Sequence, residues 1–289
     1  MTFRPTVILP TLLLLLLACA TPTPDVVFGT EPTMTPVLPN LIDEASGIAD
    51  SRTNPGALWV EQDSGNPAEL ALLGYDGKLR GKLPIPNATN RDWEDLTIGP
   101  GPATGVNYLY IADIGDNAAV HASSFIYRLP EPGTLTNVPG PVDRITFTYP
   151  DGPRDAETLM ADPQTKDLYI VSKRETKVRL YRLAYPQSTT ENRVAEYLGE
   201  LPYTFVTGGA FSSDGSEIVL RTYTNVFYWP RKKGQSVADA LQRTAARDLP
   251  LRLEPQGEAI CFDKDNRGYF TISERNNAAN VTLNYYARK

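Results

Sequence analysis

The sequence predicts an all-β fold: a five-bladed β-propeller of four-stranded blades, closed by an N-terminal strand that completes the last blade. Five related segments recur roughly 50 residues apart, a spacing typical of propeller blades. Short apolar runs separated by turn residues follow each segment. The 289 residues include 21 Gly and 25 Pro, which favour many turns and few long helices.

An export signal is predicted at residues 1–18. Arg4 is the only charged residue before Asp25, and Val7–Ala18 is a nearly continuous apolar run. That run is too short to span a bilayer and fits the apolar region of a signal peptide. Leu16–Cys19 resembles a bacterial lipobox, which implies that Cys19 is acylated. The resemblance implies an extracytoplasmic protein that is lipid-anchored in a bilayer, at the cell membrane or outer surface. An ordinary secretory signal is the alternative.

A flexible tether is expected at residues 19–36, because this segment carries Thr and Pro and few apolar side chains. The propeller domain is expected to occupy residues 37–289. Cys261 is the only other cysteine and has no free partner if Cys19 is acylated. We therefore expect Cys261 to be a buried, unpaired thiol.

The blades are predicted in chain order, from the channel outwards. First strands are expected within the related segments, at 44–50, 92–98, 155–161, 206–212 and 256–262. Second strands are expected at 57–62, 108–114, 167–173, 217–223 and 268–274, and third strands at 69–75, 125–131, 179–185, 225–231 and 282–288. Only four outer strands follow in order, at 79–85, 145–150, 195–202 and 247–253. We expect Val37–Pro39 to supply the fifth and so remove an open sheet edge.

One helix is expected from Ser236 to Ala246. Ser236 and Asp239 have the spacing of a cap and its third helical position, and Val237, Leu241 and Ala245 lie on one stripe. We interpret this helix as a structural insertion packed on the rim.

Composition restricts the classes of partner. A formal charge of −6 and a pI near 5.0 argue against nucleic acid, which requires clustered Lys and Arg. The single histidine, His121, disfavours His-based zinc sites and His-dependent nucleophilic triads. A small molecule or surface ligand at the channel mouth is the partner we expect, with the protein as a monomer.

Acidic residues recur at the middle of the first strands, which line the channel in a propeller. Glu94, Glu157 and Glu258 are equivalent, Ser46 takes this place in the first repeat and Gly208 in the fourth. Carboxylates gathered on a narrow axis repel one another, which favours a raised pKa or a bound cation. Ca²⁺ prefers six to eight hard oxygen ligands, so calcium is the expected ion. The alternative is that the carboxylates cap hairpins, hold channel water or pair with the basic residues Lys173, Arg174, Arg221 and Arg275.

This axial pattern resembles that of the calcium-activated nucleotidases (apyrases), which are secreted five-bladed propellers. The resemblance implies a calcium site at Ser46, Glu94, Glu157 and Glu258. The fourth repeat departs from it, with Thr207–Gly209 where the family has a serine. The sequence pattern of the blades also resembles that of phytase-like and lactonase-like propellers.

Three functions stay open on the sequence alone. The first is a metal-dependent hydrolase of phosphate esters or lactones, with Asp155 or Glu157 as base and Arg174, Arg221 or Arg275 as charge stabilisers. The second is a non-catalytic ligand-binding or scaffold lipoprotein with a structural ion. The third is a glycoside hydrolase that uses paired carboxylates at the axis. The loops Asp63–Asn66 and Asp113–Asn117 could touch a cation or serve only as turns.

Overall fold

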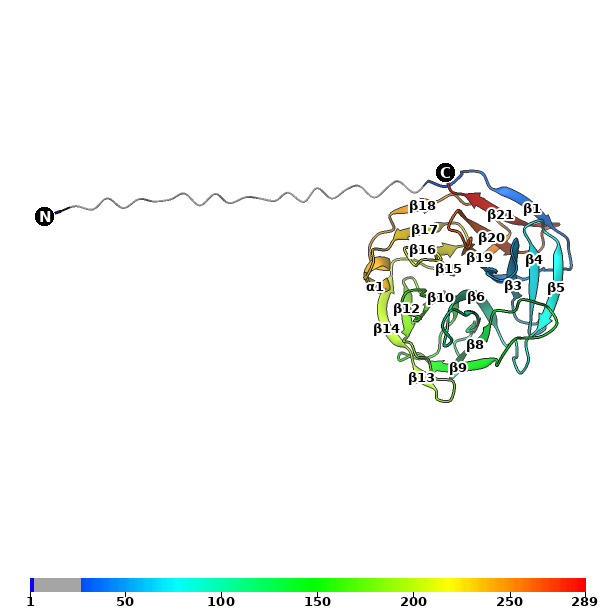
Figure 1. Ribbon diagram of the computed structural model, residues 1–289, viewed down its shortest axis with the longest axis horizontal. Coiled ribbons are helices and arrows are strands. Elements are labelled where there is room, and N and C mark those ends of the chain that lie inside the picture. The colour runs from blue at the N-terminus through cyan, green and yellow to red at the C-terminus, as the bar shows by residue number, and fades with distance from the viewer. Residues whose placement is uncertain (3–26) are drawn as a thin grey trace.

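The computed structural model describes residues 1–2 and 27–289 and shows a ring of five blades around a central axis (Figure 1). The predicted signal peptide and Cys19 lie outside the described residues. Within the described part of the chain, no helix has the length and apolar character needed to cross a membrane. The predicted five-bladed propeller of four-stranded blades is confirmed.

Blades 1 to 3 place their strands from the axis outwards. Blade 1 contains β2 (Ala45–Asp50), β3 (Ala57–Gln62), β4 (Glu69–Gly74) and β5 (Leu79–Pro84). Blade 2 contains β6 (Trp93–Pro100), β7 (Asn107–Asp113), β8 (Ser124–Pro130) and β9 (Asp143–Thr148). Blade 3 contains β10 (Ala156–Ala161), β11 (Leu168–Ser172), β12 (Val178–Leu183) and β14 (Glu196–Leu201). The short β13 (Arg193–Val194) adds to the outer edge of blade 2, where it pairs with β9 in parallel.

Blades 4 and 5 repeat this order, and blade 5 takes its outer strand from the start of the domain. Blade 4 contains β15 (Val206–Phe211), β16 (Glu217–Thr222), β17 (Val226–Pro230) and β18 (Arg247–Leu249). Blade 5 contains β19 (Gln256–Phe262), β20 (Gly268–Glu274), β21 (Val281–Ala287) and β1 (Thr33–Val37). Consecutive strands within each blade are antiparallel, so hairpins account for most of the fold.

Ring closure by an N-terminal strand is confirmed, but the strand begins earlier than expected. β1 runs antiparallel to β21 (Figure 1). Phe28 forms a further bridge to Arg288. Residues 33–36, which the sequence assigned to the tether, therefore belong to the propeller. Thr and Pro are compatible with this position, because an outer edge strand is half exposed and tolerates Pro36. Phe28 is buried edge-on against Tyr269 and anchors the start of the closing segment.

The apolar core lies between neighbouring blades rather than within any one of them. Five buried clusters each join two adjacent blades, and one of them spans the closing seam between blades 5 and 1. Such packing is expected because a sheet must bury its faces against other elements. Cys261 lies in the seam cluster, buried and free of any disulfide, as predicted.

The predicted helix is present but shorter, as α1 (Val237–Leu241) at the outer rim beside β14 and β17 (Figure 1). The Ser236 hydroxyl accepts the backbone N–H of Asp239, which is the predicted cap. Val237, Ala240 and Leu241 are buried, so the helix serves packing.

Candidate metal centre

All five innermost strands carry a β-bulge at the same place. The pairing register between the first and second strand shifts at one residue in each blade, and those residues are Ser46, Glu94, Glu157, Thr207 and Glu258. A bulge leaves its extra residue unpaired and re-aims the side chain. The sequence placed Gly208 at the fourth position; the register shift assigns Thr207 instead, because the bulge falls between Val206 and Gly208.

The two hydroxyl-bearing bulges connect neighbouring innermost strands. The Ser46 hydroxyl donates to the Trp93 carbonyl at 3.2 Å, and the Thr207 hydroxyl donates to the Gly257 carbonyl at 3.1 Å. In both cases the acceptor directly precedes the bulge of the next blade. Ser46 is therefore held by the fold, and its oxygen lies 3.4 Å from a carboxylate oxygen of Glu61.

The carboxylates gather mainly on blades 1 to 3. Asp63, Asp92 and Glu94 each offer an oxygen atom, and these atoms lie within 4.8 Å of one another. Glu94, Asp155 and Glu157 form a second group of the same size. Glu94 belongs to both groups, which makes it the centre of the cluster. A hard divalent cation fits such oxygen ligands, and no thiol or imidazole belongs to either group.

Glu258 lies near this cluster but has different neighbours. The Lys173 ammonium contacts Glu157 and lies 3.7 Å from Glu258 Oε1. Its nitrogen is also 5.4 Å from the centre of the Tyr223 ring, and the Tyr223 hydroxyl donates to Glu258 Oε1 at 3.2 Å. The structure thus contains both features that the sequence offered as alternatives, a carboxylate cluster and a basic residue within it.

Burial and mutual repulsion raise the pKa values at this mouth. Burial raises the pKa of Glu94 well above its usual range, and the carboxylates of Asp63, Glu258 and Asp92 raise it further. Burial raises the pKa of Asp63 to about 6, with Asp92 and Glu258 adding to the effect. A bound cation would remove both costs, since an opposite charge favours the ionised form.

One carboxylate oxygen of the cluster lacks a partner, and two others pack closely against a glycine. Glu157 is 3% exposed, and its Oε2 atom is buried without a hydrogen-bond partner. Gly115 follows β7, and a Cβ atom there would lie 2.2 Å from Glu94 Oε1 and 2.5 Å from Asp92 Oδ2. Only glycine leaves both carboxylates in their places. A buried carboxylate oxygen without a partner ordinarily destabilises the folded state. A missing ligand is therefore the simplest explanation for the unpartnered Oε2 atom of Glu157.

The predicted basic residues separate into two kinds. Arg174 is half-exposed at the mouth and bonds to Asp155 and Asn117, and Arg275 binds Asp43 at 2.8 Å on the rim. Arg221, by contrast, is fully buried between blades 4 and 5, where it pairs with Glu254 and donates to the Ala259 carbonyl. Arg221 therefore has a structural contact and offers no exposed donor to a ligand.

The two acidic loops also differ from each other. Asp116 accepts the backbone N–H groups of Val120 and His121, which is the contact pattern of a turn. Asp63 instead belongs to the carboxylate cluster. The sequence indicated that the Asp63 loop could touch a cation, whereas Asp92 was not predicted as a ligand.

Asp95 is a further buried acid that sequence reasoning missed. It is fully enclosed, accepts the Leu159 backbone N–H at 2.8 Å and so connects β6 with β10. It directly follows the bulged Glu94, and the extra residue of a bulge changes which face the next side chain takes. A repeated acid-x-acid spacing, present in Asp92–Glu94 and Asp155–Glu157, is the pattern that could have identified the ligands.

An open hollow of about 460 Å³ adjoins the cluster above blades 5 and 1. Its lining is polar and comprises Asp43, Glu44, Asn66, Gln256, Glu274, Arg275 and Asn276. Burial and the neighbouring Glu258 raise the pKa of Glu274 well above its usual range. A small polar ligand could therefore reach the mouth beside the carboxylates.

Comparisons with known proteins give a likeness in fold. No protein-family model matches the chain, and no curated protein sequence matches it. The PQQ-bound form of an aldose sugar dehydrogenase from Streptomyces coelicolor is 11% identical, with a TM-score of 0.47 over 91% of this chain and 100% of that one. Hydrazine synthase from Kuenenia stuttgartiensis is 10% identical, with a TM-score of 0.41 over 85% of this chain and 96% of that one. At these values neither structure indicates a function for this chain.

Proposed function

We propose that the protein binds a hard divalent cation, calcium above all, in the carboxylate cluster at the axial mouth. The observation that carries the proposal is the sharing of Glu94 by two groups of three carboxylates whose oxygens lie within 4.8 Å. Glu94, Asp155 and Glu157 would hold the ion, with Asp63 and Asp92 completing its shell. Glu258 stands across Lys173 and would act as a counter-charge to that ammonium.

Calorimetric titration of metal-free protein tests this proposal. We expect Ca²⁺ to bind with a stoichiometry near one, and Mg²⁺ to bind more weakly because it demands stricter geometry. Glu94→Gln should abolish binding, whereas Glu196→Gln, which alters an exposed acid on β14, should leave it unchanged. Absence of Ca²⁺ binding to the unmodified protein would contradict the proposal.

Hydrolysis at the same mouth is a second proposal, favoured by the adjoining polar hollow. A bound cation would polarise a phosphoryl or lactone oxygen of the substrate. Asp155 is already engaged by the Asp116 N–H and by Arg174, whereas Glu157 keeps a free Oε2 atom. Glu157 is therefore the better candidate for a base, and Arg174 and Arg275 are placed to bind the negative charge of a substrate.

Assays on nucleotides, phytate and lactones, with Ca²⁺ or with chelator, distinguish an enzyme from a binding protein. A hydrolase requires turnover that chelator abolishes and that Glu157→Gln reduces by about two orders of magnitude in protein that is still folded. Calcium binding without turnover on any of these substrates would favour the non-catalytic, ligand-binding alternative.

A lipid anchor at Cys19 is the proposed means of placing this mouth outside the cytoplasm. Its support is the sequence Leu16–Cys19 alone. Metabolic labelling with a fatty acid should mark the wild-type protein, and Cys19→Ser should release it from the membrane fraction.

A further inference from the structure

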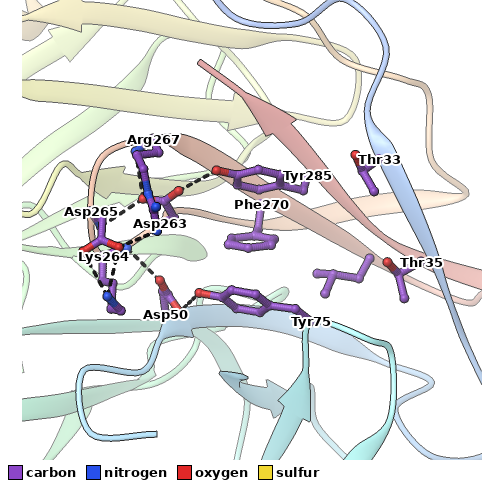
Figure 2. Close-up of a pocket in the computed structure, with 11 residues that line it drawn as sticks. Thr33, Thr35, Asp50, Tyr75, Asp263, Lys264, Asp265, Arg267, Phe270 and Tyr285 are labelled. Atoms are coloured by element: carbon purple, nitrogen blue, oxygen red, sulfur yellow. Dashed lines mark hydrogen bonds and ion pairs between the residues drawn. The ribbon is translucent and has the colours of Figure 1, made fainter. Parts of the chain in front are cut away.

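A second hollow lies on the opposite face of the ring, at the closing seam between blades 1 and 5. It has a volume of about 290 Å³ and lies beside Asp50, which ends β2, and Asp263, which follows β19 (Figure 2). The carboxylate cluster is built at the other ends of these innermost strands. The seam cavity is therefore a separate site.

Three aromatic rings form one wall of the seam cavity. The Phe270 ring lies between Tyr75 and Tyr285, with ring centres 4.8 Å and 4.6 Å away (Figure 2). Tyr75 comes from blade 1, whereas Phe270 and Tyr285 come from blade 5. Leu283 and Thr35 extend the wall towards β1. Because the Phe270 ring lies between the two tyrosines and is 3% exposed, the wall offers a ligand apolar area and the tyrosine rings from both sides of the seam.

Both tyrosine hydroxyls point to the same side and donate to buried carboxylates (Figure 2). Tyr75 donates to Asp50 at 2.6 Å, and Tyr285 donates to Asp263 at 2.6 Å. Asp50 is 1% exposed and Asp263 is 5% exposed. Because each hydroxyl has used its only proton, the two phenol oxygens and the two carboxylates can offer a ligand acceptors alone.

The basic residues at the rim are already engaged with one acid. Lys264 binds Asp265 at 2.9 Å, and Arg267 binds the same carboxylate at 2.6 Å. The backbone N–H of Lys264 also donates to Asp50 at 2.6 Å. The cavity lining therefore contains three carboxylates and two cations, and Arg52 and Arg288 interact with Asp50 and Asp263 from outside the lining.

We propose that the seam cavity binds an organic cation that carries an apolar or aromatic group. The ammonium would face Asp50, Asp263 and the phenol oxygens, and the apolar part would lie against Phe270, Leu283 and the tyrosine rings. Aromatic faces attract cations, and the fixed carboxylates add charge complementarity in a mostly buried site. The ligand would contact blades 1 and 5 together and so strengthen the ring where β1 closes it.

Benzyltrimethylammonium is the probe for calorimetric titration, with phenylacetate as the anion of similar shape. We expect the cation to bind at least about tenfold more tightly than phenylacetate and to raise the melting temperature. Removing Ca²⁺ should not affect this binding, which separates the proposal from that of the axial metal. Equal binding of the two probes, or binding of neither, would overturn it.

Substitutions in the wall provide the second test. Phe270→Leu keeps the position apolar but removes the central ring, and it should weaken benzyltrimethylammonium about fivefold or more. Phe147→Leu is the matched control, since Phe147 is a buried ring that packs on Tyr149, with ring centres 5.3 Å apart, between blades 2 and 3. Both variants should melt as single transitions. An unchanged affinity of Phe270→Leu for benzyltrimethylammonium would contradict the proposed position of the ligand.

Discussion

Buried charges are paired differently at the axial mouth and at the interfaces between blades. Arg231 reaches from blade 4 to Asp162 of blade 3 and forms two bonds of 2.9 Å, with both side chains almost fully buried. Arg221 and Glu254 join blades 4 and 5 in the same manner. At the mouth, Glu94 instead lies within 4.8 Å of four other carboxylates, and Lys173 is shared by Glu157 and Glu258.

The balance of buried charge therefore distinguishes the ion pairs that hold the blades together from the carboxylates at the mouth. Asp162 and Glu254, two acids at the interfaces between blades, each have their own arginine, because an uncompensated buried charge is strongly destabilising, and the enclosed Asp95 is held by backbone N–H groups instead. The mouth keeps a surplus of buried carboxylates that the fold itself does not neutralise. Such a surplus is stable only if some carboxylates are protonated or a cation is added. The raised pKa values of Asp63 and Glu94 correspond to the protonated case.

The largest effect is expected where a paired interface charge is broken. Arg231→Met leaves Asp162 buried without its partner and should lower the free energy of unfolding by about 3–5 kcal/mol. Denaturant unfolding measures the loss, which should be the same with and without Ca²⁺. Arg182→Met, which breaks a half-exposed pair with Glu196, is the control and should cost less than about 1 kcal/mol. A small loss in Arg231→Met would show that this pair does not hold blades 3 and 4 together.

A substitution at the centre of the mouth should change the stability of the metal-free protein in the opposite direction. Glu94→Gln removes one of the repelling carboxylates, so the metal-free protein should become more stable, not less. The same substitution should weaken Ca²⁺ binding by at least about two orders of magnitude, because it removes the oxygen that both groups share. Thermal melts with and without Ca²⁺ give both results. If metal-free Glu94→Gln is less stable than the wild type, Glu94 stabilises the fold in the same way as the charges between blades.

The sequence was sufficient for the architecture but not for the ligand set. Related segments and turn residues predicted five blades, because every blade must repeat the same alternation of buried and exposed positions. The start of β1 was missed because an outer strand needs few apolar residues, so Thr33–Pro36 has the composition of a tether.

At the site, the bulges are the reason why prediction was incomplete. A bulge shifts side-chain alternation by one residue, and single-sequence patterns do not show where the shift occurs. Gly208 was therefore chosen in place of Thr207. Glu94 and Glu157, which the sequence assigned to the axis, lie in the cluster, whereas Asp63 reaches it through the loop after β3. The engagement of Arg221 with Glu254 depends on a contact between blades that spacing along one chain does not reveal.

Lys173 sharpens the comparison, because its contact with Glu157 is a buried ion pair at the mouth, like the pairs between blades. Lys173→Met removes the ammonium that competes with a metal for Glu157, so Ca²⁺ should bind about tenfold more tightly. The metal-free variant should also be less stable, since Glu157 and Glu258 lose their shared counter-charge. Titration calorimetry measures the first effect and melting the second. Weaker Ca²⁺ binding in Lys173→Met would instead assign the lysine to positioning of the ligands.

The smallest expected effect is the contribution of the mouth to the pH dependence of stability. Asp63, with a pKa raised to about 6, and Glu94, with a pKa raised well above its usual range, bind more protons in the folded than in the unfolded state. The free energy of unfolding of metal-free protein should therefore fall as pH rises from about 4 through about 6. The difference between wild type and Glu94→Gln, measured by melting across that range, isolates the mouth from other titrating groups. Ca²⁺ should cancel the fall, because a bound cation keeps the carboxylates ionised at little cost. A wild-type curve that runs parallel to that of Glu94→Gln would mean that the surplus charge at the mouth is already compensated within the fold.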